Sequence, residues 1–250
     1  MSKDFFSKQS DEYSVSRPTY PRPLFDFLAS LVDRKEIAWD CATGNGQAAI
    51  VVSEYFRQVI ASDMSKRQIE NAKQKSNVRY EVFPAEKTTL EDNSVDLVTV
   101  AQALHWFNFD EFYKEVRRVL RKDGVIAAWA YGLHSTSPDV DKVTYHLYED
   151  ILGEYWPKER KYIENRYEDI PFPFEQIPAP QFEIRLDWSL SDLMNYLYTW
   201  SSTQQFIAKN NYDPVKQIKD QLERAWGDQQ KRQVVWPIYM KVGLLPAFWQ

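Results

Sequence analysis

A short glycine-rich turn between an apolar strand and a helix constrains this chain more than any other feature. The stretch runs Trp39-Asp-Cys-Ala-Thr-Gly-Asn-Gly-Gln-Ala-Ala-Ile50, and Asp63 ends the next apolar run. Gly44 and Gly46 let backbone N–H groups approach a ligand, because no Cβ stands in the way. An acidic side chain just past the second strand can accept hydrogen bonds from a ribose. The turn is therefore predicted to bind a nucleoside.

The rhythm of apolar segments predicts a doubly wound α/β fold. Strands are expected at residues 37–41, 58–62, 78–83, 95–101 and 124–130, with helices at 23–34, 47–56, 65–75 and 109–120. Alternating strands and helices, with nearly continuous apolar strands, indicate a parallel sheet covered on both faces. Further strands at 182–188 and 233–242 would bring the mostly parallel sheet to seven.

The last third of the chain has a different pattern. Residues 139–165 read as helical, 171–180 as a proline-rich connector, and 189–206 and 213–226 as two helices. We therefore expect an N-terminal lid segment at 1–22, a cofactor-binding core at 23–132, and a part at 133–250 that completes the sheet and adds a helical, aromatic lid.

Composition narrows the classes of partner. The net charge is −5 and no long run of Lys or Arg is present, which argues against a nucleic-acid partner. Cys41 is the only cysteine, so no disulfide within the chain and no Cys-built metal site is expected. The N-terminus has no apolar signal segment and no stretch reaches membrane-spanning length, so a cytoplasmic protein without a membrane partner is expected.

The turn itself fits two kinds of cofactor. Residues 44–49, Gly-Asn-Gly-Gln-Ala-Ala, match the G-x-G-x-x-A fingerprint of dinucleotide sites, with Asp63 near the distance expected for a ribose acid. This leaves an NAD(P)-dependent oxidoreductase open. Asp40, however, would repel a pyrophosphate and would suit an ammonium or sulfonium group.

At these residues the chain resembles the class I S-adenosylmethionine-dependent methyltransferases. Their acid-x-Gly-x-Gly-x-Gly motif corresponds to Asp40-Cys-Ala-Thr-Gly-Asn-Gly46, with Ala42 in place of the first glycine. The segment Gln102-Ala-Leu-His-Trp-Phe107 is similar to a subgroup of small-molecule enzymes that resemble trans-aconitate methyltransferase. The resemblance implies a Rossmann-like methyltransferase fold and S-adenosylmethionine as cofactor. The implied cofactor-binding residues are Asp40, Ala42, Thr43, Gly44, Asn45, Gly46, Asp63, Met64, Ala85, Glu86, Gln102 and Ala103.

Substrate residues are expected around the same edge of the sheet. His105 follows the fourth strand and is a candidate general base, or it shapes the pocket beside Trp106. Arg17 could pair with a carboxylate through two parallel N–H bonds, or it is a solvated arginine before a proline. The candidate substrate-binding residues are Tyr13, Arg17, Tyr20, Trp106, His134 and Trp200, for each of which plain packing is the alternative.

The resulting hypothesis is a methyltransferase that acts on a small molecule, with a small organic acid, methylated on oxygen, as the acceptor implied by the resemblance. No metal is expected, and a monomer and a homodimer both stay open. The alternatives are an NAD(P)-dependent oxidoreductase and a non-catalytic, methyltransferase-like binding protein.

Overall fold

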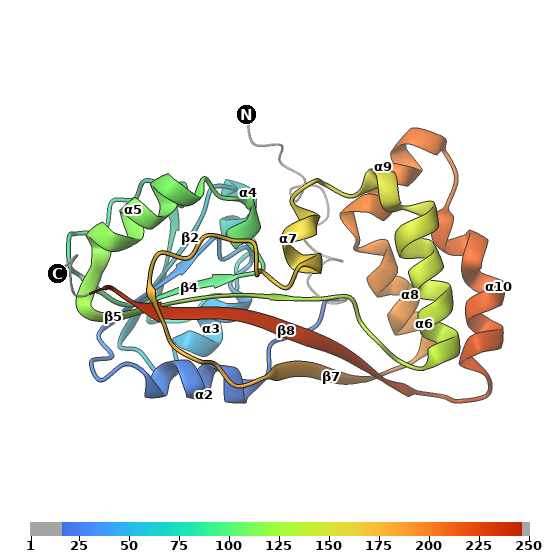
Figure 1. Cartoon of the computed structure of the whole chain (residues 1–250), viewed down its shortest axis with the longest axis horizontal. Coiled ribbons are helices and arrows are strands. Elements are labelled where there is room, and N and C mark those ends of the chain that lie inside the picture. The colour runs from blue at the N-terminus through green and yellow to red at the C-terminus, as the bar shows by residue number, and fades with distance from the viewer. Residues whose placement is uncertain (1–16, 247–250) are drawn as a thin grey trace.

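The computed structural model describes residues 17–246 (Figure 1). Tyr13 and residues 1–16 of the expected lid segment lie outside the described residues. Within residues 17–246, none of the helices combines the length and the apolarity that crossing a membrane requires.

A single sheet of eight strands forms the centre of the fold, in the order β3-β2-β1-β4-β5-β8-β6, with β7 also paired to β8. Five strands run parallel to one another: β1 (Ile37–Cys41), β2 (Gln58–Asp63), β3 (Val78–Val82), β4 (Val95–Ala101) and β5 (Leu120–Tyr131). The strands β6 (Glu175–Gln176), β7 (Phe182–Trp188) and β8 (Arg232–Leu244) come from the last third, and β8 pairs antiparallel with β5, β6 and β7. The predicted doubly wound α/β class is confirmed, with one strand more than the seven expected.

Helices cover both faces of the sheet and extend it at one end. The first half contributes α2 (Arg22–Ser30), α3 (Gln47–Val52), α4 (Lys66–Glu70), the 3₁₀ turn η1 (Leu104–Trp106) and α5 (Phe109–Val119). The second half contributes α6 (Pro138–Tyr145), the π-helical turn η2 (His146–Ile151), η3 (Gly153–Tyr155), α7 (Arg160–Glu164), α8 (Leu190–Tyr198), α9 (Ser201–Asn210) and α10 (Pro214–Trp226). Figure 1 shows α6, α8, α9 and α10 gathered beyond the ends of the long strands β5 and β8, while α2 and α5 lie on opposite sides of the sheet.

Strand β5 shows how alternation of side chains divides the core into two layers. Successive side chains of a strand point to opposite faces. Trp129 and Tyr131 join the layer that contains α2 and the C-terminal helices. Ala128 and Ala130 join the layer beneath α5. All four residues are buried, so the sheet is covered on both sides at the edge where the strands end.

Side-chain caps explain where several helices begin. Ser65 accepts a hydrogen bond from the Gln68 N–H and caps α4, as the sequence predicted. Ser189 and Asp192 form a reciprocal capping box at the start of α8. Asp213 caps α10 by accepting from two backbone N–H groups.

The structure corrects three expectations for the last third. Residues 189–206 are two helices, because Trp200 is extended and begins the second. Residues 139–165 are broken into short pieces around Gly153 and Pro157. The proline-rich connector contains the two-residue strand β6, since β8 is long enough to pair with it.

Candidate active site

The glycine-rich turn lies at the carboxyl ends of β1 and β2, the edge where open α/β sheets bind ligands. The Thr43 N–H donates to the Ser62 carbonyl at 2.8 Å, and the Gly46 N–H donates back to the Thr43 carbonyl at 3.0 Å. Ala42, Gly44 and Gly46 all have positive φ, of 52°, 57° and 85°. This conformation suits glycine and is strained for Ala42.

Asp40 sits inside the sheet just before the turn and is only 1 % exposed. Its carboxylate accepts hydrogen bonds from the hydroxyls of Thr43 and Thr99. Burial raises the pKa of Asp40 to about 6, although the hydrogen bonds from Thr43 and Thr99 act in the other direction. A buried carboxylate of this kind would be stabilised by a positively charged ligand group.

Asp63 ends β2 and ties the turn to the strand beside it. Its two carboxylate oxygens accept from the Gly44 N–H at 3.0 Å and from the Ser65 N–H at 2.8 Å. A Cβ built on Gly44 would meet nothing within 4 Å, so space is open beside this turn. Asp63 and the turn are therefore close together, as the sequence suggested.

The other expected cofactor residues lie along the same edge with varied surroundings. Met64 is 62 % exposed, whereas Ala85 and Ala103 are buried. The Glu86 carboxylate accepts from the Asn108 N–H at 3.1 Å. The Gln102 side chain accepts from the Tyr131 N–H at 2.8 Å and thereby joins β4 to β5. Contact of these residues, and of Asn45, with a cofactor stays a prediction.

His105 lies in η1 immediately after β4 and is 5 % exposed. Its Nδ1 is 2.9 Å from the hydroxyl of Tyr167, which is completely buried. Burial and, to a lesser extent, the positive charge of Arg160 lower the pKa of His105 to about 3. The imidazole is therefore neutral at physiological pH.

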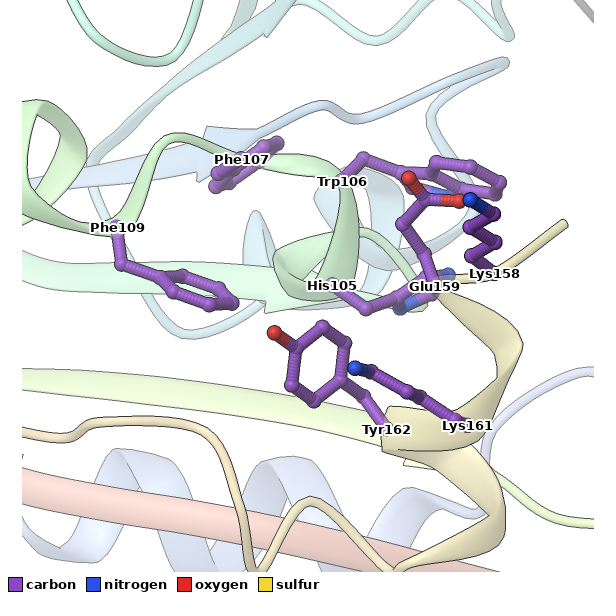
Figure 2. Close-up of a pocket in the computed structure, with 8 residues that line it drawn as sticks. All are labelled: His105, Trp106, Phe107, Phe109, Lys158, Glu159, Lys161 and Tyr162. Carbon is purple, nitrogen blue, oxygen red and sulfur yellow. The ribbon is translucent and has the colours of Figure 1, made fainter.

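A pocket of about 260 Å³ opens between η1 and α7, and His105 lines it (Figure 2). Its walls are mostly aromatic and its rim carries charge; the lining residues are His105, Trp106, Phe107, Phe109, Lys158, Glu159, Lys161 and Tyr162. The rings of Phe109 and Tyr162 pack edge to face in its wall, with centroids 5.6 Å apart. The pocket thus joins an aromatic wall to a rim with two ammonium groups and one carboxylate.

Arg17 reaches the end of β5 from the N-terminal segment. Its guanidinium donates to the Tyr131 hydroxyl at 3.3 Å and to the Thr199 carbonyl at 3.1 Å. Tyr20 packs edge-on against Trp129, and burial, followed by the influence of Tyr131, raises its pKa well above the usual value. The structure therefore brings two expected substrate residues, Arg17 and Tyr20, to the same place.

His134 and Trp200 lie together in an aromatic cluster beyond the end of β5. The His134 ring is 4 % exposed and packs against Tyr196, Trp200 and Trp236. Neither ring nitrogen has a hydrogen-bond partner in the described part of the chain. Burial lowers the pKa of His134 to about 4. Trp200 also contacts Tyr148 and Trp156, so packing accounts for much of its surface.

Three residues at this edge escaped the sequence analysis. Thr99 could have been found, because a hydroxyl in an apolar strand next to the Asp40 strand needs a partner. Tyr131 ends β5 at the ligand-binding edge, one residue past the strand expected at 124–130. Tyr167 carries no signal, since it follows a short helix in an irregular loop.

Comparison with known proteins identifies relatives of this chain. Residues 39–128 match the family described as "Methyltransferase domain". A protein of Dictyostelium discoideum that is named as a methyltransferase is 39 % identical over 245 residues, which cover 95 % of this chain and 93 % of that relative. A protein of Saccharomyces cerevisiae that is named as an S-adenosylmethionine-dependent methyltransferase is 32 % identical over 133 residues, 49 % of this chain and 45 % of that relative.

A solved structure is similar over nearly the whole chain. It is described as a type II methyltransferase from Anaeromyxobacter dehalogenans, and it is 40 % identical in sequence with a TM-score of 0.86. The similarity covers 92 % of this chain and 99 % of that one. The overall fold is therefore shared with this protein over most of the chain.

Proposed function

Because this chain belongs to the S-adenosylmethionine-dependent methyltransferases, we propose that it methylates a small carboxylic acid on a carboxylate oxygen. The observation that carries the proposal is the position of Arg17, whose guanidinium lies beside Tyr131 at the ligand-binding edge of the sheet. A guanidinium binds a carboxylate through two parallel hydrogen bonds. The identity of the acid is left to experiment.

The residues present fit S-adenosylmethionine. The space beside Gly44 is open, and the buried Asp40 carboxylate has no cationic partner among residues 17–246. In this proposal Asp40 and the backbone of 42–46 hold the charged methionine part, and Asp63 holds the ribose hydroxyls. The bound cofactor supplies an activated methyl group.

A carboxylate acceptor sets few chemical demands on the protein. It is ionised at neutral pH and needs no base to become a nucleophile. The work of the chain is then to align the acceptor and to exclude water. Arg17 would orient the acceptor, and the aromatic residues around it would keep water out.

The dehydrogenase alternative is not supported. The relatives are named as methyltransferases over nearly the full chain, and the buried Asp40 would repel a pyrophosphate at the turn. A binding protein without catalysis is likewise not favoured by relatives that are named as enzymes.

A radiolabelled methyl-transfer assay over a panel of small molecules tests the proposal. The panel contains carboxylic acids and, for each, the amide and the alcohol of the same carbon skeleton. We expect transfer to acids only. Arg17→Ala should raise KM for the acid at least tenfold, because a charge-assisted hydrogen-bond pair contributes about 1.5–3 kcal/mol.

The Arg185→Ala variant is the matched control. Arg185 is an exposed arginine of β7 whose bonds are to Glu183 and Gln233, so its loss removes one positive charge and none of the contacts of Arg17. Its KM should equal that of the wild type. Transfer to amides or alcohols, with acids untouched, would overturn the carboxylate proposal.

A further inference from the structure

We propose that Tyr167 is a positioning residue that holds His105 in the neutral tautomer with its proton on Nε2. His105 then offers the acceptor a hydrogen-bond donor and does not act as a general base. The catalytic role of this donor rests on the proposed function, but the tautomer itself can be measured without turnover.

The first step is the contact between the two side chains. The Tyr167 hydroxyl lies 2.9 Å from His105 Nδ1, and both residues are buried. An imidazole of this kind has one nitrogen that donates and one that accepts. The direction of this single hydrogen bond therefore decides which nitrogen carries the proton.

The second step counts the hydrogens around the phenol oxygen. Burial raises the pKa of the Tyr167 phenol, so the hydroxyl keeps its hydrogen, and the nearby His105 N–H only partly offsets this effect. If Nδ1 carried the proton, the phenol oxygen would accept it and the Tyr167 hydrogen would have no acceptor among the described residues. If Tyr167 donates to Nδ1, every group at the contact is satisfied. Buried polar groups are rarely left unsatisfied, so the second arrangement is favoured.

The third step follows the proton to the other nitrogen. With Nδ1 accepting, Nε2 carries the hydrogen. Within residues 17–246 Nε2 has no hydrogen-bond partner. The atom is not fully buried, so a ligand can reach it. His105 also lines the pocket between η1 and α7. The donor is therefore available to a molecule at this edge of the sheet.

The backbone around Tyr167 is strained, which supports a functional role for the position of its side chain. Arg166 and Tyr167 both have positive φ, of 54° and 63°. Two consecutive side-chain-bearing residues in this region are unusual, and such strain concentrates at functional sites. The Tyr167 N–H donates to the Tyr162 carbonyl at 2.7 Å, which closes the loop tightly after α7.

The charges around His105 keep it neutral. Arg160, at the start of α7, opposes a second positive charge, and the rim of the pocket carries Lys158, Glu159 and Lys161. Tyr113 of α5 belongs to the same buried core layer as Tyr167 and has a small electrostatic effect on it. Burial and the positive charge of Arg160 disfavour the imidazolium, so the tautomer should persist across the physiological pH range.

The consequence narrows the class of acceptor. A fixed N–H donor stabilises an oxygen that bears negative charge, and it takes no proton from the nucleophile. The acceptor must therefore bring its nucleophile already deprotonated, as a carboxylate does. An alcohol would find no base in His105.

Nitrogen-15 NMR of histidine-labelled protein reads the tautomer directly. The chain has three histidines, and His134→Gln and His146→Gln variants assign the signals. We expect His105 to show a protonated Nε2 and an accepting Nδ1, unchanged from pH 6 to 8. In Tyr167→Phe the signals should change to a mixture of tautomers.

Tyr113→Phe is the matched control for the spectrum. It removes another buried phenol hydroxyl from the same core layer, one that donates to the Pro171 carbonyl, and should leave the His105 tautomer unchanged. Circular dichroism of all variants checks that the fold is retained. A wild-type spectrum with the proton on Nδ1, or a Tyr167→Phe spectrum identical to the wild type, would overturn the proposal.

Kinetics add a second readout. His105→Gln retains an N–H donor on a chain of similar length and should keep activity within about tenfold of the wild type, whereas His105→Ala should lose about 10- to 100-fold. Equal and complete loss in both variants would indicate a base and contradict the donor role. If no acid is methylated at all, the proposed function is wrong, but the NMR spectra still test the tautomer of His105 independently.

Discussion

The Thr99 hydroxyl donates a hydrogen bond to the Asp40 carboxylate at 2.6 Å, and the two residues are register partners on neighbouring parallel strands. The pair lies where β1 and β4 reach the ligand-binding edge. Because both side chains are buried, the carboxylate has only hydroxyl donors, Thr43 and Thr99, for side-chain partners among residues 17–246. A charge in this position is costly until a cation arrives.

Asp40→Asn is therefore expected to stabilise the cofactor-free protein at neutral pH. The pKa of Asp40 is raised from 3.8 to about 6, so the folded state favours the protonated form. The stability from this group is present below pH 3.8 and is lost as the pH rises through 6. The gain from Asn should grow between pH 4 and 7 towards a limit of about 3 kcal/mol, at about 1.4 kcal/mol per pKa unit.

Urea unfolding of both proteins at pH 4.5 and 7.5 measures this difference. Calorimetry should show that the same variant binds S-adenosylmethionine at least tenfold more weakly, since the carboxylate that we propose to face the cation is gone. A stability difference that is identical at the two pH values would contradict the argument from burial.

Gly44→Ala and Gly46→Ala should separate cofactor binding from folding. At Gly44 the new Cβ meets nothing within 4 Å, so only the left-handed backbone, with φ of 57°, costs stability, about 1–2 kcal/mol. At Gly46 the Cβ would lie 2.3 Å from the Tyr80 hydroxyl, which donates to the Lys73 carbonyl. Displacing Tyr80 should bring the total loss to about 2–4 kcal/mol.

The first variant should mainly lose cofactor affinity, and the second should mainly lose stability. Gly44→Ala should stay folded and lose cofactor affinity, because its methyl group occupies the space beside the turn. Gly46→Ala should recover part of its stability when combined with Tyr80→Phe. Thermal melts and calorimetry on the three proteins decide this, and an unaffected Kd in Gly44→Ala would count against the turn as the cofactor site.

The first half of the fold was predictable from local patterns. Strands with continuous apolar residues and the Ser65 cap are local signals, and the structure follows them through Tyr131. The break at Trp200 was not predictable, because the indole is held by rings from distant segments, Tyr148 and Trp156. Tertiary packing outweighs local propensity there.

The candidate site divides in the same way. Asp40, Asp63 and the glycines are neighbours in the turn and in adjacent strands, so spacing alone places them. The contact of His105 with Tyr167 joins residues 62 positions apart and depends on a loop with positive φ. Periodicity carries no information about such a contact.

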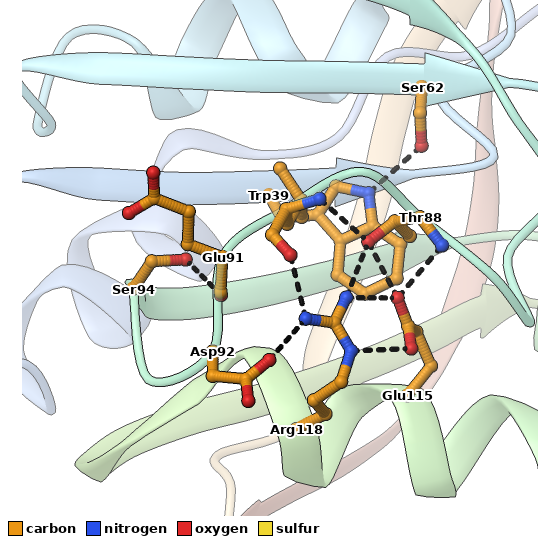
Figure 3. Close-up of polar contacts among 9 residues, drawn as sticks. Trp39, Ser62, Thr88, Glu91, Asp92, Ser94, Glu115 and Arg118 are labelled. Carbon is orange, nitrogen blue, oxygen red and sulfur yellow. Dashed lines mark hydrogen bonds and ion pairs between the residues drawn. The ribbon is translucent and has the colours of Figure 1, made fainter.

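Arg118→Lys should destabilise the protein without weakening cofactor binding. The Arg118 guanidinium makes a fork with Glu115, at 2.6 and 3.0 Å, and also donates to the Leu90 carbonyl and Asp92 (Figure 3). Glu115 in turn accepts from the Thr88 N–H at 2.8 Å. A lysine cannot reproduce this geometry, and the partly buried network should lose about 2–3 kcal/mol.

Urea unfolding gives the loss, with Arg185→Lys as the control. The Arg185–Glu183 pair is about half exposed on both sides and should contribute less than about 1 kcal/mol. The Kd for S-adenosylmethionine should stay within about threefold, since the network holds residues 88–92 and not the turn. Equal losses in the two variants would show that the Arg118 network has no special stability.

His134→Phe is expected to stabilise the protein in acid, and its kinetics distinguish acceptor binding from packing. The pKa of His134 is lowered by burial from 6.5 to about 4, so the folded state requires the neutral ring. Stability from this group is present above pH 6.5 and is lost as the pH falls towards 4, by up to about 3 kcal/mol. Phenylalanine fills the same aromatic cluster and has no nitrogen to protonate, so its unfolding midpoint in acid should move to lower pH. Phenylalanine also lacks the two buried ring nitrogens that have no partners among residues 17–246, which should add about 1–2 kcal/mol to the stability at pH 7.

Acid titration followed by circular dichroism measures the shift of the unfolding midpoint, and His146→Gln, at an exposed histidine paired with Asp150, should show no shift. If His134 binds the acceptor, His134→Phe raises KM for the acid and leaves the Kd for the cofactor unchanged; a stabilised variant with unaltered KM would assign His134 to packing alone.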